Sequence, residues 1–449
     1  MVSLSSRKSS LSIILRPFLV ANPIINYRVG ELAFCKSPIY PIYPTNQFHH
    51  RQDLPAPPHA KNMSQKPIYL DCHATTPLDP QVLAAMLPYF TEHFGNASSI
   101  NHVYGWTAEA AVKQARETIA AAINSSPEEI IFTSGATEAN NLAIKGVAEA
   151  YFAKGRHIVT VMTEHRAVLD PCHYLEKLGF EVTILPVGAD GLIDLELLEK
   201  SLRPDTILLS IMAANNEIGV IQPLAAIGAI CRQYQVLFHT DAAQAIGKIP
   251  LDVEEMNIDL MSLTAHKVHG PKGIGALYVR RRDPRVRLAA QIQGGGQEKG
   301  LRSGTLFTPQ IVGFAKAVEL GIKAIEEDTS HLNQLKARLW EIISQLDRIY
   351  LNGHPSQRLA GNLNISIEGV DGAALLLGLQ PIVALSSGSA CSSSHTAPSH
   401  VLTALGRPES LAYASLRFGL SRFNTLEEIE LVGEQVVLTV NSLRKAKNF

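Results

Sequence analysis

This sequence has few cysteines and no excess of positive or negative charge. Only 5 of the 449 residues are cysteine, and 40 basic residues are matched by 41 acidic ones, which gives a formal net charge of -1. So near-neutral a chain gives no electrostatic reason to expect nucleic acid or an anionic membrane as a partner, and a small molecule is the expected ligand. The cysteines are odd in number and irregularly spaced, which argues against a disulfide framework and for a reducing compartment. No pair has the CxxC spacing of a zinc site. They are Cys35, Cys72, Cys172, Cys231 and Cys391.

Long apolar runs are absent as well. The best one, Leu11 to Leu15, ends at Arg16 and falls short of the roughly 20 residues that a membrane span requires, so no span is predicted. The hydrophobic share of 46% is ordinary for a globular enzyme. Two domains are expected, because single hydrophobic cores stop growing near roughly 250 to 300 residues.

Residues 1–66 differ in composition from the rest of the chain. Four basic residues precede the first acidic one, Glu31: Arg7, Lys8, Arg16 and Arg28. Such a composition is typical of a transit peptide, which would place the protein in mitochondria or plastids. The alternative is an extension that is disordered or not translated, because Met63 directly precedes the first strand-like sequence at Ile68. We predict the alternative, and with it a cytoplasmic location.

From Gln81 to Glu319 short apolar strands alternate with helical patterns, which predicts an α/β fold with a mostly parallel sheet covered on both faces. Strands are predicted at 130–133, 157–161, 180–186, 207–211 and 236–240, and helices at 108–122, 168–178 and 224–234. After about Ile322 the pattern changes to long amphipathic helices (331–346 and 425–447) with strands at 363–367 and 415–420. We therefore predict a large domain over residues 81–321 and a smaller α+β domain built from residues 67–80 and 322–449.

Polar residues closely follow several of these strands. Ligands of such sheets bind beyond the carboxyl ends of the strands, so these residues are expected to meet in one crevice. They are Ser134–Asn140, His165, Asn215–Glu217 and Asp241–Gln244.

Lys267 lies between two further predicted strands and is flanked by His266 and His269. A solvated loop lysine is the commoner interpretation of such a residue, but a carboxylate at a neighbouring strand end, Asp241, favours a lysine that holds an aldehyde cofactor covalently. The turn at Thr133–Asn140 offers backbone N–H groups to a phosphate, although ordinary helix capping explains its hydroxyl groups equally well. For Arg417, inside an apolar segment, a clamp on a carboxylate and a structural salt bridge are both open.

In combination, these motifs resemble those of the cysteine desulfurases of the iron-sulfur-cluster type, which are fold-type-I pyridoxal-phosphate (PLP) enzymes of the class V aminotransferase group. The resemblance runs from about Pro67 to Lys445. Its motifs are YLDCHATTP (69–77), FTSGATE (132–138), TEH (163–165), NNEIG (215–219), HTDAAQ (239–244), HK (266–267), RSGT (302–305) and SSGSAC (386–391).

Residue by residue, the resemblance implies a complete site for PLP and L-cysteine. Lys267 would carry PLP as a Schiff base, Asp241 would bond the pyridine nitrogen, and His165 would stack on the ring. Arg417, with Asn216, would bind the substrate carboxylate, and Cys391 would take the sulfur, which leaves L-alanine and a persulfide. Asn216 and Gln244 are implied for the phenolic oxygen. The phosphate is implied to bind Ala136, Thr137, Thr264, His266 and the partner subunit's Thr305, hence a homodimer.

The resemblance also implies partners for the reaction. The persulfide is expected to pass to acceptor proteins such as a cluster scaffold, for iron-sulfur cluster assembly and other thio-cofactor or tRNA-thiolation pathways. No resident metal is predicted, only a transient contact of Cys391 with a cluster. Thr264-Ala265 departs from the usual Ser-Gly, and the chain ends at Phe449 without the extension that helps to dock the scaffold in close relatives.

Two other classes of function remain as alternatives. One is a different PLP reaction, that of an aminotransferase or a selenocysteine lyase, but transamination has no use for a cysteine in a Gly/Ser loop predicted to be mobile. The other is a non-catalytic regulatory or scaffold protein, against which the intact Lys267, Asp241 and His165 weigh.

Overall fold

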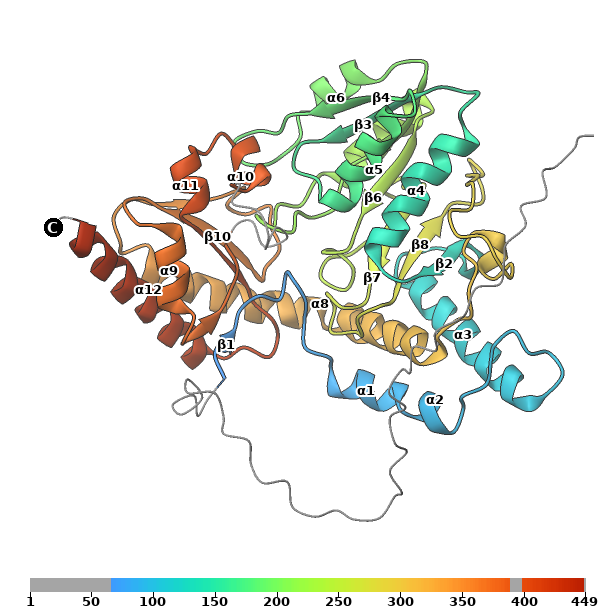
Figure 1. Ribbon diagram of the computed structural model, residues 1–449, viewed down its shortest axis with the longest axis horizontal. Coiled ribbons are helices and arrows are strands. Elements are labelled where there is room, and N and C mark those ends of the chain that lie inside the picture. The colour runs from blue at the N-terminus through green and yellow to red at the C-terminus, as the bar shows by residue number, and fades with distance from the viewer. Residues whose placement is uncertain (1–65, 388–397, 448–449) are drawn as a thin grey trace, which may run out of the picture. The chain divides into compact units, whose positions relative to one another are not determined.

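The computed structural model describes residues 66–387 and 398–447. The predicted N-terminal extension, up to residue 65, and Cys391 therefore lie outside the described residues. A seven-stranded sheet dominates the fold, with the strand order β2-β8-β7-β6-β5-β3-β4 (Figure 1). Every neighbouring pair is parallel except the two that involve β8, so the expected mostly parallel α/β sheet is confirmed. Its strands are β2 (Ile130–Thr133), β3 (His157–Val161), β4 (Glu181–Leu185), β5 (Thr206–Ser210), β6 (Leu237–Asp241), β7 (Leu260–Thr264) and β8 (Gly275–Val279).

Successive residues of these strands point to opposite faces of the sheet, and each face packs against its own hydrophobic core. Leu208 belongs to the core under α4 and α5, whereas its neighbour Leu209 belongs to the core that includes residues of α3, α7 and α8. The cores on both faces of the sheet thus explain why most of the strands have apolar residues at consecutive positions instead of a strict alternation with polar ones. The helices are α3 (Val103–Ala121), α4 (Ala136–Ala150), α5 (Arg166–Glu176), α6 (Leu195–Ser201) and α7 (Leu224–Tyr234).

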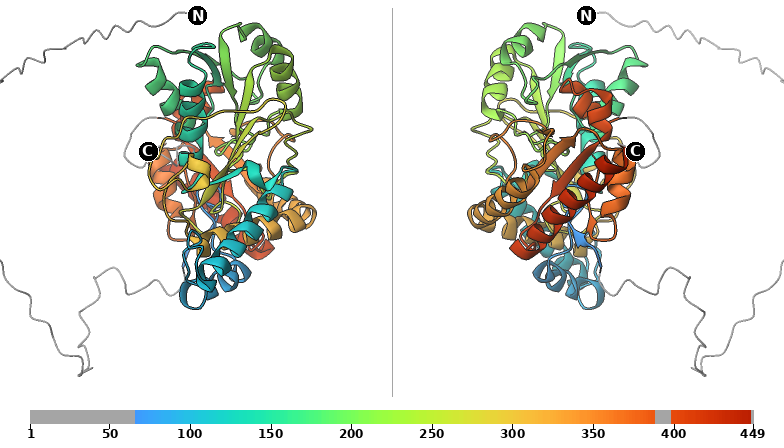
Figure 2. Two further views of the ribbon diagram at one scale, coloured as in Figure 1. Left: turned by 90° about the vertical axis from the view of Figure 1, so that its right-hand side faces the viewer. Right: turned by 90° about the vertical axis from the view of Figure 1, so that its left-hand side faces the viewer.

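The C-terminal part of the chain builds a second, smaller sheet. In it β10 (Asn362–Ile367) pairs antiparallel with β12 (Ser415–Gly419) on one side and β9 (Ile349–Leu351) on the other. The right-hand view of Figure 2 turns the red helix α12 (Leu426–Lys447) towards the reader. This part has a core of its own, to which α9 (Gly372–Leu379) and α12 contribute. The remaining short elements are β1 (Ile68–Tyr69), which pairs with β11 (Val383–Ala384), and α1 (Pro80–Met86), α2 (Pro88–Thr91), α10 (His400–Ala404) and α11 (Glu409–Tyr413).

Helix α8 differs from the prediction. A helix was expected over 331–346 after a change of character near Ile322, but α8 runs unbroken over 36 residues, Thr308–Ile343. Its first half packs into the core of the large sheet through Phe314 and Val318, and its second half packs into the smaller core through Leu335 and Leu339. One helix therefore contributes to both cores, and the division into two domains stays a prediction.

No helix within the described ranges is long and apolar enough to cross a membrane.

Candidate active site

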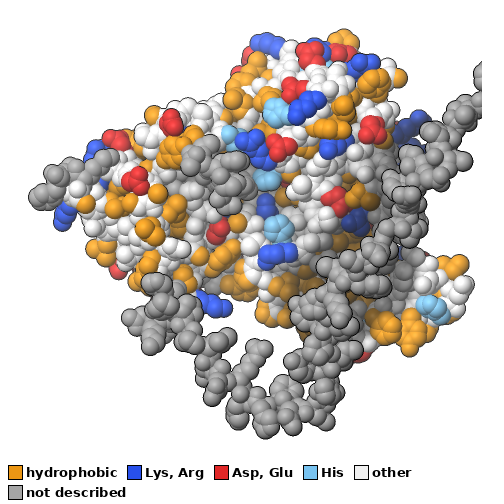
Figure 3. Space-filling view, viewed as in Figure 1, with side chains coloured by type: hydrophobic (Ala, Val, Ile, Leu, Met, Phe, Trp, Pro, Cys, Tyr) orange, Lys and Arg blue, Asp and Glu red, His pale blue; other side chains and the backbone are white. Residues whose placement is uncertain are grey.

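A cavity of about 430 Å³ lies where the parallel strands of the large sheet end. Ten residues singled out from the sequence line it: Ala136, Thr137, His165, Asn216, Asp241, Gln244, Thr264, His266, Lys267 and Arg417. The residues that follow the strands therefore line one cavity, as expected. On the face drawn in Figure 3, histidine and basic side chains gather along the middle of the molecule.

Asp241 is the last residue of β6 and is buried. Its Oδ1 accepts a hydrogen bond from the backbone N–H of Ala243 (2.9 Å), and its Oδ2 accepts one from the side-chain amide of Asn140 in α4 (2.7 Å). Each carboxylate oxygen has a second lone pair, so Asp241 is held in place and can still accept a further proton donor from the cavity. Asn140 was quoted in a sequence motif, but no role was predicted for it.

His165 caps the N-terminus of α5, where its Nδ1 accepts a hydrogen bond from the backbone N–H of Ala167 (3.0 Å). Burial, followed by the charge of Lys267, lowers the pKa of His165, so the ring is neutral near pH 7. A neutral ring with Nδ1 as acceptor carries its proton on Nε2. His165 is thus oriented and uncharged, as a residue that lies against a ring cofactor needs to be.

A further part of the cavity lining suits a phosphate. Helix α4 begins at Ala136 after Gly135, whose φ of 151° only glycine adopts readily, and its first N–H groups border the cavity together with Thr264 of β7. His266 is anchored by a hydrogen bond between its Nδ1 and Thr75 Oγ1 (3.2 Å). Burial and then Lys267 lower the pKa of His266 to about 4, so it offers this part a neutral ring.

Arg417 lies in β12 with 1% of its surface exposed, and it reaches the cavity from the smaller sheet. It donates to the backbone oxygen of Asn216 (2.9 Å) and forms an ion pair with Asp71 (2.7 Å). Within the described chain, Arg417 Nε and Asn216 Oδ1 are buried without a hydrogen-bond partner. A salt bridge is therefore present. Buried polar atoms normally have a hydrogen-bond partner, so Arg417 Nε and Asn216 Oδ1 are available to a ligand.

The ends of the segment that contains Cys391 are fixed near Arg417. The backbone N–H of Arg417 donates to the oxygen of Ser386 (2.9 Å), five residues before Cys391. On the other side, Ser399 donates to the Glu217 carboxylate, and His400 contacts the backbone oxygen of Glu164 (3.0 Å). Both attachment points adjoin residues of the cavity.

The three cysteines that the structure describes are buried. Burial raises the pKa of the Cys72 thiol to about 11 and that of Cys172 to about 12, and it raises the pKa of Cys231 further. Thiols with raised pKa values are poor nucleophiles at neutral pH. Cys172 of α5 and Cys231 of α7 are therefore expected to be unreactive.

Thr305 behaves differently from the other predicted phosphate ligands. It is exposed and does not line the cavity of its own chain. This position agrees with a role in a second subunit, which stays a prediction.

The residues present fit PLP. One cavity is bordered by a carboxylate for the ring nitrogen, the amine of Lys267 and a helix N-terminus for the phosphate. A protein that binds an aldehyde cofactor with a phosphate group needs this set. Lys272 and Arg417 add positive charge, which suits the two anionic groups of a cofactor and an amino-acid substrate.

Comparisons with known proteins identify the family. The aminotransferase class-V model matches residues 68–432. A protein of Rickettsia bellii named cysteine desulfurase IscS is 53% identical over 379 residues, which cover 84% of this chain and 92% of the relative. A mitochondrial cysteine desulfurase of Arabidopsis thaliana is 54% identical, over 85% of this chain and 84% of the relative.

A solved structure described as SspA in complex with cysteine is 40% identical, with a TM-score of 0.71. The match covers 80% of this chain and all (100%) of that one. From the family match, the two relatives and the fold, the chain belongs to the aminotransferase class-V family of PLP-dependent enzymes, within the group of the cysteine desulfurases.

Proposed function

We propose that the chain is a PLP-dependent cysteine desulfurase that converts L-cysteine to L-alanine and a persulfide on Cys391. The observation that carries the proposal is the convergence of Lys267, Asp241 and Arg417 on one cavity from three distant segments. The first two suit the cofactor and the third suits the carboxylate of an amino acid.

When bound, PLP supplies an electron sink that weakens bonds at the substrate's α-carbon. Asp241, fixed by Asn140 and Ala243, would hold a proton on the pyridine nitrogen. The amine of Lys267 would attach the cofactor and be released when substrate binds. His165, neutral and oriented by its contact with Ala167, carries its proton on Nε2, so it would first donate to the substrate and could accept a proton only after giving that one up.

Arg417 would orient the substrate. Its guanidinium is held by Asp71 and by the backbone oxygen of Asn216, which leaves Nε as the donor that has no partner within the described chain. A guanidinium fixed in advance loses little freedom when a carboxylate binds. Since Arg417 also holds the Ser386 backbone, substrate recognition and the start of the Cys391 segment share one residue.

The Cys391 segment begins beside Arg417, which suits sulfur transfer from the bound substrate to Cys391. The Cys391 thiolate would bond to the substrate sulfur while the carbon-sulfur bond breaks, and the carbon takes up a proton to give L-alanine. The extra sulfur then leaves with an acceptor protein, for iron-sulfur cluster assembly and other thiolation pathways. The names of the relatives support the desulfurase reaction.

A homodimer is part of the proposal. Beside the exposed Thr305, Phe307 contacts Phe90 of α2 (ring centroids 5.9 Å apart), and α2 adjoins further exposed apolar residues. Phe94, Ile100 and Trp106 there expose 63%, 75% and 54% of their surface. Apolar exposure on this scale supports a protein interface at this position, next to the residue expected to serve the partner's phosphate.

The compartment is a prediction. The relatives include bacterial proteins and a mitochondrial one. We propose a cytoplasmic location, with translation from Met63. Mass spectrometry of the endogenous protein's N-terminus would test it, since cleavage within residues 1–62 would instead indicate import into an organelle.

Incubation of the purified, PLP-loaded protein with L-cysteine tests the function. Sulfide in the presence of a reductant, and an equal amount of alanine, are expected. Formation of a keto acid with loss of PLP absorbance would instead indicate transamination, and no product at all would support a non-catalytic role.

A further inference from the structure

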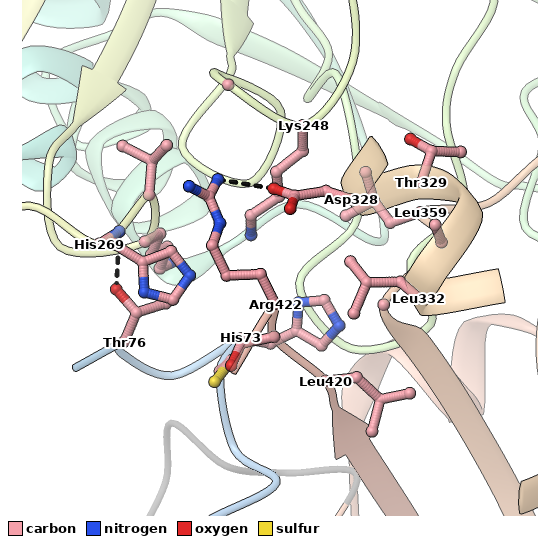
Figure 4. A pocket seen from close by; sticks show the side chains of 17 residues that line it. His73, Thr76, Lys248, His269, Asp328, Thr329, Leu332, Leu359, Leu420 and Arg422 are labelled. Atoms are coloured by element: carbon pink, nitrogen blue, oxygen red, sulfur yellow. Dashed lines mark hydrogen bonds and ion pairs between the residues drawn. The ribbon is translucent and has the colours of Figure 1, made fainter. Parts of the chain in front are cut away.

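A second, smaller cavity of about 50 Å³ lies next to the cofactor cavity and shares Lys267 and His73 with it. Its polar lining includes Cys72, Lys248, Asp328 and Arg422 (Figure 4). Arg422 and Asp328 form an ion pair (2.6 Å), so their charges compensate each other. Lys248 points into this cavity, and in residues 66–387 and 398–447 it makes no ion pair with a carboxylate.

Lys248 is bonded to a residue of the cofactor site instead. Its Nζ donates to Oε1 of Gln244 (3.2 Å), and Nε2 of Gln244 donates to the backbone oxygen of His73 (2.8 Å). The Nδ1 of His73 lies 3.3 Å from the same Oε1. Burial, followed by Lys248, lowers the pKa of His73 well below its ordinary value, so the ring is neutral and Nδ1 is the nitrogen that carries its proton.

These contacts determine which way the Gln244 amide points. An ammonium group can only donate and a backbone carbonyl can only accept, so Oε1 must face Lys248 and Nε2 must face His73. The amide nitrogen has two protons, and the bond to His73 uses one of them. The other remains for the cofactor cavity, which Gln244 also lines.

We infer that Lys248 is a positioning residue for the cofactor, because its ammonium fixes the Gln244 amide with an N–H group available to the phenolic oxygen of PLP. The inference rests on the proposed function, which places PLP in the larger cavity. Lys248 does not touch the reacting atoms, and it acts through Gln244.

Protonation of Lys248 is then coupled to attachment of the cofactor. The groups that face Lys248 are Gln244 on its own segment, Cys72 and His73 of the 71–76 segment, Lys267 and His269 after β7, Asp328 of α8, and Arg422 after β12. Burial first, and then the ammonium of Lys267, lower the pKa of Lys248 to about 7. An unprotonated Schiff base on Lys267 would carry no charge there, which would raise the pKa of Lys248 and favour the form that orients Gln244.

Spectral titration of the PLP-bound protein tests the inference. A hydrogen bond to the phenolic oxygen stabilises its ionised form, so Lys248→Met should raise the midpoint of the visible pH titration by about one unit. Lys336→Met is the matched control, because Lys336 is also half-buried, has a pKa lowered by burial to about 8, and lines neither cavity. Lys336→Met should leave the midpoint unchanged. Lys248→Arg keeps a side chain that can only donate, so its titration midpoint should equal that of the wild type.

A double-mutant cycle separates positioning from a simple charge effect. In a Gln244→Leu background, Lys248→Met should produce no further shift, because the amide that it orients is gone. Equal shifts in both backgrounds would overturn the inference, as would titrations that are identical in wild type and Lys248→Met. Should Lys248→Met fail to hold PLP, Lys248→Ala takes its place in the cycle. Absence of a PLP band in the wild type would overturn the proposed function, and this inference with it.

Discussion

At the scale of single residues, the cavity depends on supporting side chains that hold its functional groups in position. Asn140 is buried and donates to Asp241, and Asp71 binds Arg417. The separations in sequence, 101 and 346 residues, explain why neither partner could be predicted from the chain alone. Lys267, Asp241 and His165 could be predicted because each carries a recognisable chemistry at a strand end, whereas a supporting asparagine does not.

Asn140→Ala should weaken PLP binding. The variant removes one of the two hydrogen bonds that hold Asp241, which contributes about 1 to 2 kcal/mol, so an increase of roughly 5- to 30-fold in the dissociation constant is expected. Titration of the apoprotein with PLP, followed by absorbance, measures it. Asn141→Ala is the control, since its amide bonds the Thr137 backbone oxygen and not Asp241. Equal affinities for wild type and Asn140→Ala would rule out this supporting role.

Glu217 gives a prediction for pH. Burial raises its pKa to about 7, against the opposing effects of the Ser399 hydrogen bond and Arg417. The folded protein therefore binds this proton more tightly than the unfolded chain, so the resulting stability is present below about pH 4.5 and is lost as pH rises to about 7. In Glu217→Gln the free energy of unfolding should fall less between pH 5 and 8 than in wild type, by about 1 to 3 kcal/mol. Urea denaturation at both pH values measures the difference, and parallel pH profiles would contradict the assignment.

At the scale of elements, apolar runs predicted the strands of the large sheet to within two residues. Both faces of that sheet are covered, so the strands carry apolar residues at successive positions and are easily recognised. The start of α8 could not be predicted in the same way. Its two halves turn their apolar residues to different cores, so the pattern changes near Gly321 although the helix continues.

Gly321 gives a prediction for α8. A Cβ there would lie 2.8 Å from a methyl carbon of Val268 and 3.1 Å from the Cα of Gly247, and Val268 follows Lys267 directly. Gly321→Val should therefore destabilise the protein by about 1 to 3 kcal/mol and lower its PLP occupancy. Glu326→Val, at an exposed position of the same helix, is the control. A melting temperature and PLP occupancy equal to those of wild type would show that the packing here is looser than the structure indicates.

At the scale of the whole molecule, the proposed dimer makes a prediction. Ile100→Glu places a charge in the exposed apolar patch near Phe307, so it should convert dimers to monomers and weaken PLP binding. Sedimentation velocity with and without PLP measures both states. Leu377→Glu, on α9 at a residue that is 70% exposed, should leave the dimer intact. A fully active wild-type monomer would refute the proposed role of the partner subunit's Thr305.

The central claim concerns sulfur transfer to Cys391. Cys391→Ser should keep PLP and its first spectral change with L-cysteine, but sulfide release should fall by roughly a hundredfold or more, since a hydroxyl is a far weaker nucleophile than a thiolate. The most direct test is the mass of the Cys391 peptide after wild-type protein has been treated with L-cysteine. We predict one added sulfur atom on Cys391, and none in Lys267→Ala. An unmodified Cys391 in a sample that nevertheless forms alanine and sulfide would contradict the persulfide mechanism.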